Sequence, residues 1–221
     1  MKRFYVLLGV IGVVGAAALW YAAAGSPSVS AGLAPGAAPP PPAADGFTGF
    51  TLGSDSAPVE VVEYSDFECP YCAQFAAVQM PTVQEQLIET GKVRWRYRDF
   101  PLPSHAYARL ASHAAHCAGE QERFWEMHDQ LFFNHSWAQT GRDPNKLFRG
   151  FAERIGVDLN RYDDCMASGR HAGRIEASRL EGTQRQVSGT PTLFVNGRLY
   201  SGPRSSDALK ALVDSMTAVR R

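Results

Sequence analysis

The sequence has few cysteines and no excess of charge of either sign. Four cysteines in 221 residues are too few for a small domain held together by disulfides, and a chain of this length can build a hydrophobic core without them. The 22 basic residues match 22 acidic ones, so the net charge indicates neither nucleic acid nor another polyanion as a partner. No internal repeat is present, and the composition is that of a globular protein.

The spacing of cysteine and histidine argues against a metal site. Cys69 and Cys72 form one Cys-x-x-Cys pair, which offers only two of the ligands that tetrahedral zinc requires. Cys117 and Cys165 stand alone, and no second Cys-x-x-Cys pair or His-x3–5-His pair follows at zinc-finger distance. His113 and His116 are three residues apart, and such a pair more often has a surface or packing role. We therefore expect no metal and no cofactor.

The N-terminal residues 1–24 predict export. Lys2 and Arg3 precede residues 4–24, which carry no charge. A helix of about 20 apolar residues crosses the hydrocarbon core of a bilayer, and the positive flank predicts a cytoplasmic N-terminus. The alternative is a signal peptide cleaved after Ala24. Both interpretations place the rest of the chain at the periplasmic face, tethered to the cytoplasmic membrane or released as a soluble periplasmic or secreted protein. Disulfides persist in such an oxidising compartment.

Residues 25–46 are rich in proline, alanine, glycine and serine. Such a segment cannot bury enough apolar surface to offset its ordering entropy, and its run of four prolines favours an extended polyproline II conformation. We expect a disordered linker over 25–46 and a folded domain over 47–221.

Two strands are predicted around the cysteine pair. Residues 58–67 are rich in β-branched side chains and run directly into the pair. Residues 73–91 have a helical pattern that Pro81 should kink rather than end. The strand over 92–100 alternates strictly, with Val93, Trp95 and Tyr97 on a face that we expect to be buried and Arg94, Arg96 and Arg98 on a face that we expect to be solvated. Strand, helix and strand together predict a parallel βαβ unit.

The remainder predicts a helical block followed by a hairpin. Residues 104–186 read as consecutive helices, with Ser104 as the first cap. Residues 189–202 form a predicted hairpin that turns at Asn196–Gly197, and an amphipathic helix closes the chain. The simplest architecture is a small mixed sheet with an inserted set of helices.

The two cysteines of the pair should differ in chemistry. Cys69 lies where a strand passes into a helix, and the unpaired N–H groups of a helix start stabilise a thiolate. Its pKa should fall from ~8.5 into the range of ~3.5–7.5. Cys72 lies one turn further and should be buried and protonated. Cys69 would then form mixed disulfides as the nucleophile, and Cys72 would resolve them.

The neighbours of Cys69 fit this prediction to different degrees. Pro70 suits the first position of a helix, and Tyr71 offers a ring without a charge. Glu68 could relay a proton or oppose the thiolate, or it could be a surface acid of the first turn, and both interpretations stay open. Further along, "SGTPT" places Thr190–Pro191 at the start of a strand, where a cis bond would form a tight turn and leave backbone groups for a partner chain.

Four segments resemble a known family: "YSDFECPYC", "RYRDFPLPSHAYARLASHAAHCAGEQERFWEMHDQLF", "GVDLNRYDDCMASG" and "VSGTPTLFVNG". Together they resemble the DsbA-like family of bacterial thiol:disulfide oxidoreductases over nearly all of residues 50–221. The resemblance implies an α/β fold, a thioredoxin-like mixed sheet with a helical insertion over about 104–186. It also implies Cys69 as nucleophile, Cys72 as resolving cysteine and Thr190–Pro191 as the cis-proline loop.

The resemblance also implies partners. Substrates would be unfolded exported proteins, and a quinone-linked membrane thiol oxidase would reoxidise the pair. Strong oxidants of the family carry Pro-His between the cysteines, and the Pro70–Tyr71 dipeptide departs from that pattern, so the oxidising strength stays open. We expect a monomer, because no dimerisation element is apparent.

The remaining cysteines and histidines are predicted to be structural. Two unpaired thiols in an exported protein would be open to oxidation, so we predict a Cys117–Cys165 disulfide; the alternative is two buried thiols. His128 should pack among aromatic side chains, and His105 should lie near a helix cap. Tyr64 and Phe67 should pack beneath the cysteine pair.

The favoured function is oxidation of thiols in exported proteins. A reductase or isomerase of the same fold is the first alternative, and the redox potential separates the two. A thioredoxin-like chaperone or assembly module, with incidental thiols, is the second.

Overall fold

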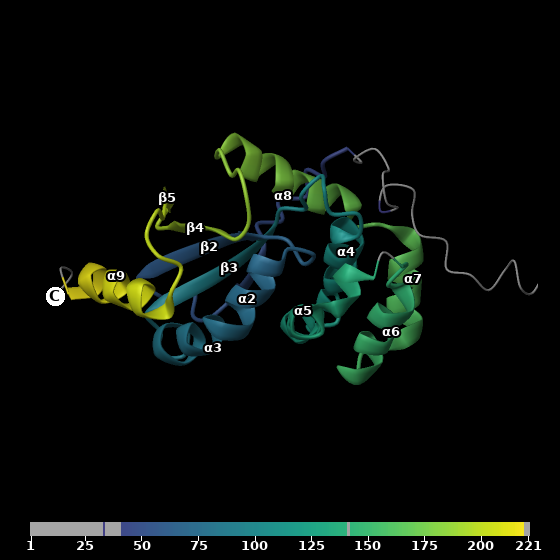
Figure 1. The fold of residues 1–221 in the computed structure, drawn as a ribbon, viewed down its shortest axis with the longest axis horizontal. Coiled ribbons are helices and arrows are strands. Elements are labelled where there is room, and N and C mark those ends of the chain that lie inside the picture. The colour runs from purple at the N-terminus through teal and green to yellow at the C-terminus, as the bar shows by residue number, and fades with distance from the viewer. Residues whose placement is uncertain (1–32, 34–40, 141, 219–221) are drawn as a thin grey trace, which may run out of the picture.

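The computed structural model describes Leu33, residues 41–140 and residues 142–218 (Figure 1). The expected membrane segment, residues 4–24, and most of the expected linker lie outside this part of the chain. Across the described residues, no helix combines the length and the apolar character needed to span a bilayer.

A five-stranded mixed sheet forms the centre of the domain. Its spatial order is β1 (Phe50–Leu52), β3 (Val93–Asp99), β2 (Val59–Ser65), β4 (Thr192–Val195) and β5 (Arg198–Leu199). β2 and β3 run parallel, as the predicted βαβ unit requires, and every other pairing is antiparallel. The sequence does not predict β1, because three residues are too few for an alternating pattern.

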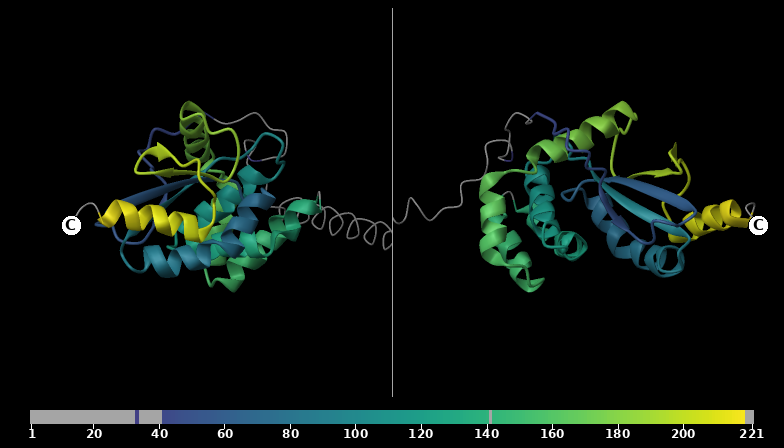
Figure 2. Two further views of the ribbon diagram at one scale, coloured as in Figure 1. Left: turned by 60° about the vertical axis from the view of Figure 1, so that its left-hand side comes forward. Right: turned by 180° about the vertical axis from the view of Figure 1, so that it is seen from behind.

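The described helices follow in chain order: α2 (Pro70–Val78), α3 (Met80–Val83), the π-helical turn η2 (Gln84–Ile88), α4 (Ala108–Gly119), α5 (Phe124–Phe133), the 3-10 turn η3 (His135–Gln139), α6 (Asn145–Arg154), α7 (Leu159–Ser168), α8 (Ala172–Gln184) and α9 (Ser206–Ala218). Helices α4 to α7 gather at one end of the sheet and α9 lies at the other, in front and rear views alike (Figures 1 and 2). The helices between β3 and β4 are the predicted insertion.

Helices cover both faces of the sheet. Val61 of β2 packs in one cluster with Trp95, Phe75 of α2 and Val213 of α9. Its neighbour Val62 belongs to a separate cluster with Tyr64, Phe100 and Phe194, on the face that α8 covers. Burial of such side chains stabilises the fold by roughly 1.5–3 kcal/mol each. Because side chains alternate along a strand, odd-numbered residues of β2 point toward α2.

The arginine face of β3 is less solvated than its alternation suggests. Arg94 and Arg96 both donate to Glu60 Oε1, at 2.8 and 2.7 Å. The side chain of Arg98 is only 4% exposed and pairs with Glu181 of α8. The expectation of a solvated face is therefore wrong for Arg98: α8 packs over it, and a buried guanidinium requires an acidic partner.

The helix after the cysteine pair is interrupted rather than merely kinked. α2 ends at Val78, and the chain restarts as α3 after Gln79 before passing into η2. Pro81 has no N–H to bond to the preceding turn, so the helical hydrogen-bond pattern fails near this point. The segment still runs up to Gly91, whose φ of 72° suits a glycine after a helix.

The first helix of the insertion begins later than predicted. α4 starts at Ala108 with Tyr107 as its N-cap, so Ser104 is not the cap. Acidic side chains near the cysteine pair bind two backbone N–H groups of the preceding loop: Asp66 accepts from Leu102 and Glu68 accepts from Tyr107, both at 2.7 Å. These bonds hold the loop outside the helix.

Two turns and one terminal segment complete the domain. Asn196 and Gly197 have φ values of 47° and 79°, which confirms the predicted type I′ hairpin. Residues 41–46, the last part of the expected linker, lie against α8: the Ala43 N–H donates to Gly173 O at 2.8 Å, and Arg174 pairs with Asp45. Where the linker begins stays a prediction.

Candidate active site

Cys69 is the N-cap residue of α2, and Pro70 is its first helical residue. The Cys69 N–H donates to Asp66 O at 3.0 Å, and its carbonyl accepts from Ala73 N at 3.1 Å. No side chain caps this helix start. The partial positive charge of the first turn is therefore directed at the Cys69 sulfur.

The two sulfurs of the pair are electrostatically unlike. A hydrogen bond from Cys72, with smaller contributions from Thr190 and the backbone N–H groups of Cys72 and Tyr71, lowers the pKa of Cys69 to about 5 against the opposing effect of burial. Burial, and then the neighbouring Cys69, raise the pKa of Cys72 well above its usual value. One thiol is thus ionised at neutral pH while the other holds its proton.

The side chain of Cys69 is almost fully buried. It keeps 3% of its surface exposed, whereas Cys72 keeps none. The neighbouring dipeptide lies outward, with Pro70 exposed and Tyr71 70% exposed. Only a small part of Cys69 is therefore open to a partner chain, which must approach closely to reach the sulfur.

The Thr190–Pro191 peptide bond is cis and faces Cys69. Thr190 O lies 3.5 Å from Cys69 Sγ, close enough to accept from the protonated thiol. The buried Thr190 hydroxyl has no hydrogen-bond partner among the described atoms, so it is available to donate to the thiolate. The loop before β4 thus contacts the sulfur in either protonation state.

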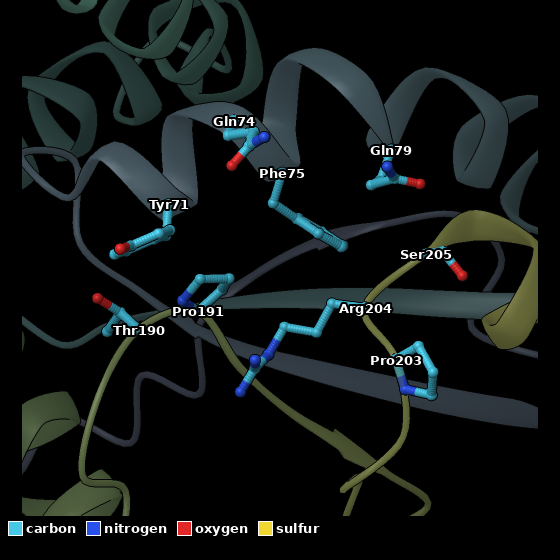
Figure 3. Close-up of a pocket in the computed structure, with 9 residues that line it drawn as sticks. All are labelled: Tyr71, Gln74, Phe75, Gln79, Thr190, Pro191, Pro203, Arg204 and Ser205. Atoms are coloured by element: carbon cyan, nitrogen blue, oxygen red, sulfur yellow. The ribbon is translucent and has the colours of Figure 1, made fainter.

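A cavity of about 580 Å³ lies next to this loop (Figure 3). α2 forms one wall, Thr190 and Pro191 form a second, and the loop that precedes α9 forms the third. Its lining residues are Tyr71, Gln74, Phe75, Gln79, Thr190, Pro191, Pro203, Arg204 and Ser205. The cavity is large enough for several side chains of a bound peptide.

Asp66 organises the turn that presents Cys69. Its carboxylate is fully buried and accepts from Glu68 N and Leu102 N, each at 2.7 Å, and lies 2.8 Å from His105 Nδ1. Sequence reasoning missed Asp66 and assigned His105 only to a cap. An acid three residues before the nucleophile was the available signal, but its partners come from a loop more than 30 residues away.

Glu68 is not a free surface acid, because its carboxylate binds the insertion. It is half-buried, and Oε2 accepts from the N–H of Tyr107, the N-cap of α4. Burial raises the pKa of its carboxyl group. Glu68 thus ties the turn at the cysteine pair to the start of the insertion, and a role as proton relay stays a prediction.

A second buried acid lies beside the inner cysteine. Glu63 of β2 is 2% exposed, and its Oε2 accepts from Trp95 Nε1 at 3.0 Å. Burial raises the pKa of Glu63, and its charge in turn raises the pKa of Cys72. Sequence reasoning missed this residue too. The signal was an acid on the inward-facing side of a β-branched strand, in phase with Val61.

Comparison with known proteins assigns this geometry to a family. The thioredoxin family profile matches residues 47–215. The chain belongs to the thioredoxin family. Within it, the resemblance to DsbA-like proteins is confirmed by the relatives and solved structures that match it.

The relatives of this thioredoxin-family chain carry two kinds of name. A Salinispora tropica protein named Na(+)/H(+) antiporter NhaA 3 is 45% identical over 170 residues, which are 76% of this chain and 25% of that protein. A Bacillus anthracis protein named probable disulfide bond formation protein D is 26% identical over 167 residues, 74% of this chain and 76% of that protein. This chain therefore spans about a quarter of the length of the antiporter-named relative.

A solved structure matches this chain with similar identity and coverage. The reduced form of the disulfide bond oxidoreductase DsbG from Mycobacterium tuberculosis superposes with a TM-score of 0.63 at 29% identity. The match covers 76% of this chain and 86% of that one. The thioredoxin-like sheet and its inserted helices are thus shared along most of both domains.

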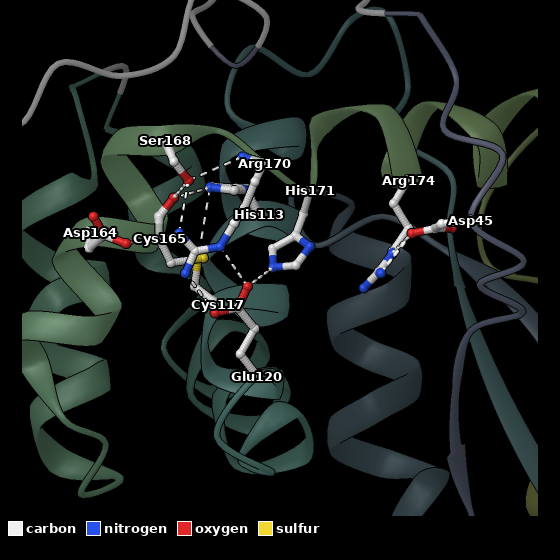
Figure 4. Close-up of polar contacts among 10 residues, drawn as sticks. All are labelled: Asp45, His113, Cys117, Glu120, Asp164, Cys165, Ser168, Arg170, His171 and Arg174. Carbon is white, nitrogen blue, oxygen red and sulfur yellow. Dashed lines mark hydrogen bonds and ion pairs between the residues drawn. A yellow bond between two sulfur atoms is a disulfide. The ribbon is translucent and has the colours of Figure 1, made fainter.

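The insertion of this thioredoxin-family domain contains a disulfide. Cys117 of α4 and Cys165 of α7 are bonded, with their Cα atoms 5.7 Å apart (Figure 4). His113 and His171 lie around the bridge, and burial lowers the pKa of both imidazoles, to about 3 and about 4. Both groups of potential metal-ligand atoms found in the described chain include Cys165. Its sulfur is bonded in the disulfide and offers no thiolate.

Phe67 packs beneath the pair as expected, whereas Tyr64 does not, because its position in β2 turns it to the opposite face of the sheet. Phe67 stacks on Tyr97 with ring centroids 5.1 Å apart, and His128 lies edge-on to both rings. Tyr64 is fully buried on the other face of the sheet, where its hydroxyl donates to Glu181 at 2.7 Å.

Proposed function

We propose that the chain is a thiol:disulfide oxidoreductase that introduces disulfides into exported proteins through Cys69 and Cys72. The asymmetry of the pair carries the proposal: Cys69 has a pKa of about 5 at a helix start, while the pKa of the buried Cys72 is raised well above normal. A low pKa makes Cys69 a good leaving group in thiol–disulfide exchange. A raised pKa keeps Cys72 protonated until it must resolve a mixed disulfide.

Oxidation of a substrate proceeds in two exchanges. A substrate thiolate attacks Cys69 Sγ of the oxidised pair, forming a mixed disulfide and releasing Cys72 as a thiolate that takes up a proton. A second substrate thiolate then attacks the substrate sulfur of the mixed disulfide, and Cys69 leaves as its stabilised thiolate. The substrate loses two electrons and the pair gains them.

We propose that Glu63, whose charge raises the pKa of Cys72, handles the proton of that thiol. Its raised pKa lets the carboxyl group donate a proton when Cys72 is released and accept one when Cys72 must attack again. The second case arises on reoxidation, when a partner disulfide has joined Cys69 and the Cys72 thiolate displaces it. We propose a quinone-linked membrane thiol oxidase as that partner.

The stabilised thiolate favours oxidation of substrates over their reduction. A pKa of about 5, against ~8.5 for an ordinary thiol, stabilises the reduced pair at pH 7 by about 3 kcal/mol, which raises its potential by roughly 60 mV. A reductase or isomerase of the same fold is the alternative, and a reductase would require a pair with a lower potential. The names of the two disulfide-related relatives also support the proposed class.

The setting of the reaction is proposed with it. Substrates are unfolded chains exported to the periplasmic face, where residues 4–24 hold the domain at the cytoplasmic membrane, or where it acts after cleavage as a soluble monomer. Sodium–proton exchange is not proposed, because the antiporter-named relative is matched over only 25% of its length.

The test is oxidation of a reduced, unfolded protein by the oxidised domain. The wild-type domain should regenerate substrate disulfides stoichiometrically, and Cys69→Ser should abolish the reaction. Cys72→Ser has no disulfide of its own, so its Cys69 is first converted to the mixed disulfide with 5-thio-2-nitrobenzoate. A substrate thiolate should then attack Cys69 Sγ and release the thionitrobenzoate anion, and the resulting mixed disulfide with the substrate should accumulate on non-reducing gels because Cys72 is absent. Equal oxidation by the Cys69→Ser variant would refute the function. A potential near that of a cellular reductant would assign the reductase alternative.

A further inference from the structure

The cavity beside the cis-proline loop has a single charged lining residue. Eight of the nine residues around it are uncharged, and the ninth is Arg204. The sequence of α2, which forms one wall, contains no charged side chain. The electrostatic character of the cavity is therefore decided by one guanidinium group.

Arg204 is held by its backbone while its side chain stays available. The loop is fixed at both sides, since the Ser206 N–H donates to Gln79 Oε1 at 2.8 Å and the Tyr200 hydroxyl donates to Pro203 O at 2.9 Å. In the part of the chain that the structure describes, no carboxylate lies within ion-pair distance of Arg204. Figure 3 shows its side chain extending from this loop toward Pro191.

No neighbouring acidic group in the described chain neutralises the positive charge of Arg204. Asp207, in the first turn of α9, is the nearby acid in sequence, and it is exposed and forms no ion pair with Arg204. The start of α9 lies next to Arg204 and contributes a partial positive charge of its own. Thr190 both contacts Cys69 and lines the cavity, so a peptide whose cysteine reacts at Cys69 has its flanking side chains within reach of the cavity.

We propose that this cavity selects substrate cysteines that have an acidic side chain nearby in the sequence, and that Arg204 is the residue that recognises it. The inference rests on the proposed function and adds a substrate preference to it. Guanidinium and carboxylate match in charge and in hydrogen-bond geometry. The apolar walls, Phe75 and Pro191, would bury the stem of the same side chain.

The test uses three peptides that differ only at the positions two residues before and after a single cysteine, with Glu, Gln or Lys at both. The initial rate of mixed-disulfide formation with the oxidised domain is measured for each. Flanking charge changes the reactivity of a peptide thiol by itself, so each rate is divided by the rate of the same peptide with hydroxyethyl disulfide, which is uncharged.

The wild-type domain should favour the Glu peptide over the Lys peptide by about fivefold after this correction, as expected for a partly exposed ion pair. Arg204→Gln should bring the ratio close to one, and Arg204→Glu should invert it. Arg198→Gln is the matched control, because Arg198 is an exposed arginine of β5 outside the cavity, and it should keep the wild-type ratio. High salt should reduce the preference.

Two failures are distinguishable. If the oxidised domain reacts with none of the peptides and does not oxidise dithiothreitol, the proposed function itself is wrong. If it reacts with all three at equal corrected rates, or if the preference survives Arg204→Gln, the enzyme stands and the acidic preference is wrong.

Discussion

His105 Nδ1 lies 2.8 Å from the fully buried carboxylate of Asp66. Asp66 raises the pKa of His105, and the nearby Cys69 contributes in the same direction. The raised pKa favours the imidazolium, which pairs with this carboxylate, and the charge of Cys69 acts on the same ring. Since Tyr71 between the two cysteines has no charge, His105 supplies a cationic side chain that the dipeptide lacks.

His105→Gln should raise the pKa of Cys69, because it leaves the Asp66 carboxylate uncompensated beside the thiolate. We expect a rise of about one unit, which lowers the redox potential by roughly 30 mV. The thiolate absorbance at 240 nm measured against pH, and equilibration with glutathione, report the two quantities. The control is the double variant Asp66→Asn/His105→Gln, which removes both charges and should return the pKa of Cys69 toward its wild-type value. An unchanged pKa in the single variant would contradict the electrostatic role.

The stability of the reduced protein should depend on pH through Cys69. Folding depresses the pKa of this thiol from ~8.5 to about 5. The thiolate therefore contributes fully above pH ~8.5, and its contribution is lost as the pH falls through about 5. Between these limits, the free energy of unfolding of the reduced form should gain about 1.4 kcal/mol per pH unit relative to the oxidised form. Urea unfolding of both forms from pH 4 to 8 measures the difference, and parallel curves would contradict the low pKa.

Glu63→Gln should slow the step in which Cys72 attacks the mixed disulfide. The amide can still accept from Trp95 Nε1, but it cannot take the proton of Cys72. We expect a decrease of about tenfold to a hundredfold at pH 7, in the range of general base catalysis. Stopped-flow measurement of release from a mixed disulfide at Cys69 tests this. Glu60→Gln is the control, because Glu60 lies on the opposite face of the same strand with Arg94 and Arg96, and it should leave the rate unchanged.

Removal of the Cys117–Cys165 disulfide should destabilise the domain without changing the chemistry of Cys69. The bridge joins residues 48 positions apart, and the chain-entropy model assigns about 4 kcal/mol to a loop of this length. The Cys117→Ala/Cys165→Ala variant should therefore unfold at lower urea concentration, while its Cys69 titrates as in the wild type. A changed pKa of Cys69 in the folded variant would instead link the bridge to the active site.

The local pattern of the chain was enough to predict much of the fold. Alternation in residues 92–100 and the β-branched run before Cys69 predict the parallel pair, and Asn196–Gly197 predicts the hairpin turn that the structure contains. These features depend on near neighbours, whose spacing decides which face of an element becomes buried. The sequence pattern did not predict the interruption before Pro81 or the late start of α4. The first follows from the missing N–H of Pro81, and the second from backbone N–H groups that donate to Asp66 and Glu68, and neither cause leaves a trace in the spacing of apolar residues.

By itself, the sequence determined that two cysteines stand at a strand-to-helix junction, and that Thr190–Pro191 enters a strand far along the chain. The tertiary structure alone decided which charged groups come near the site: Asp66 with His105, Glu63 near Cys72, and Arg204 in the adjacent cavity. Each of these groups acts through space, and electrostatic interaction depends on distance and burial rather than on separation along the chain. A pattern of neighbouring residues cannot supply either quantity.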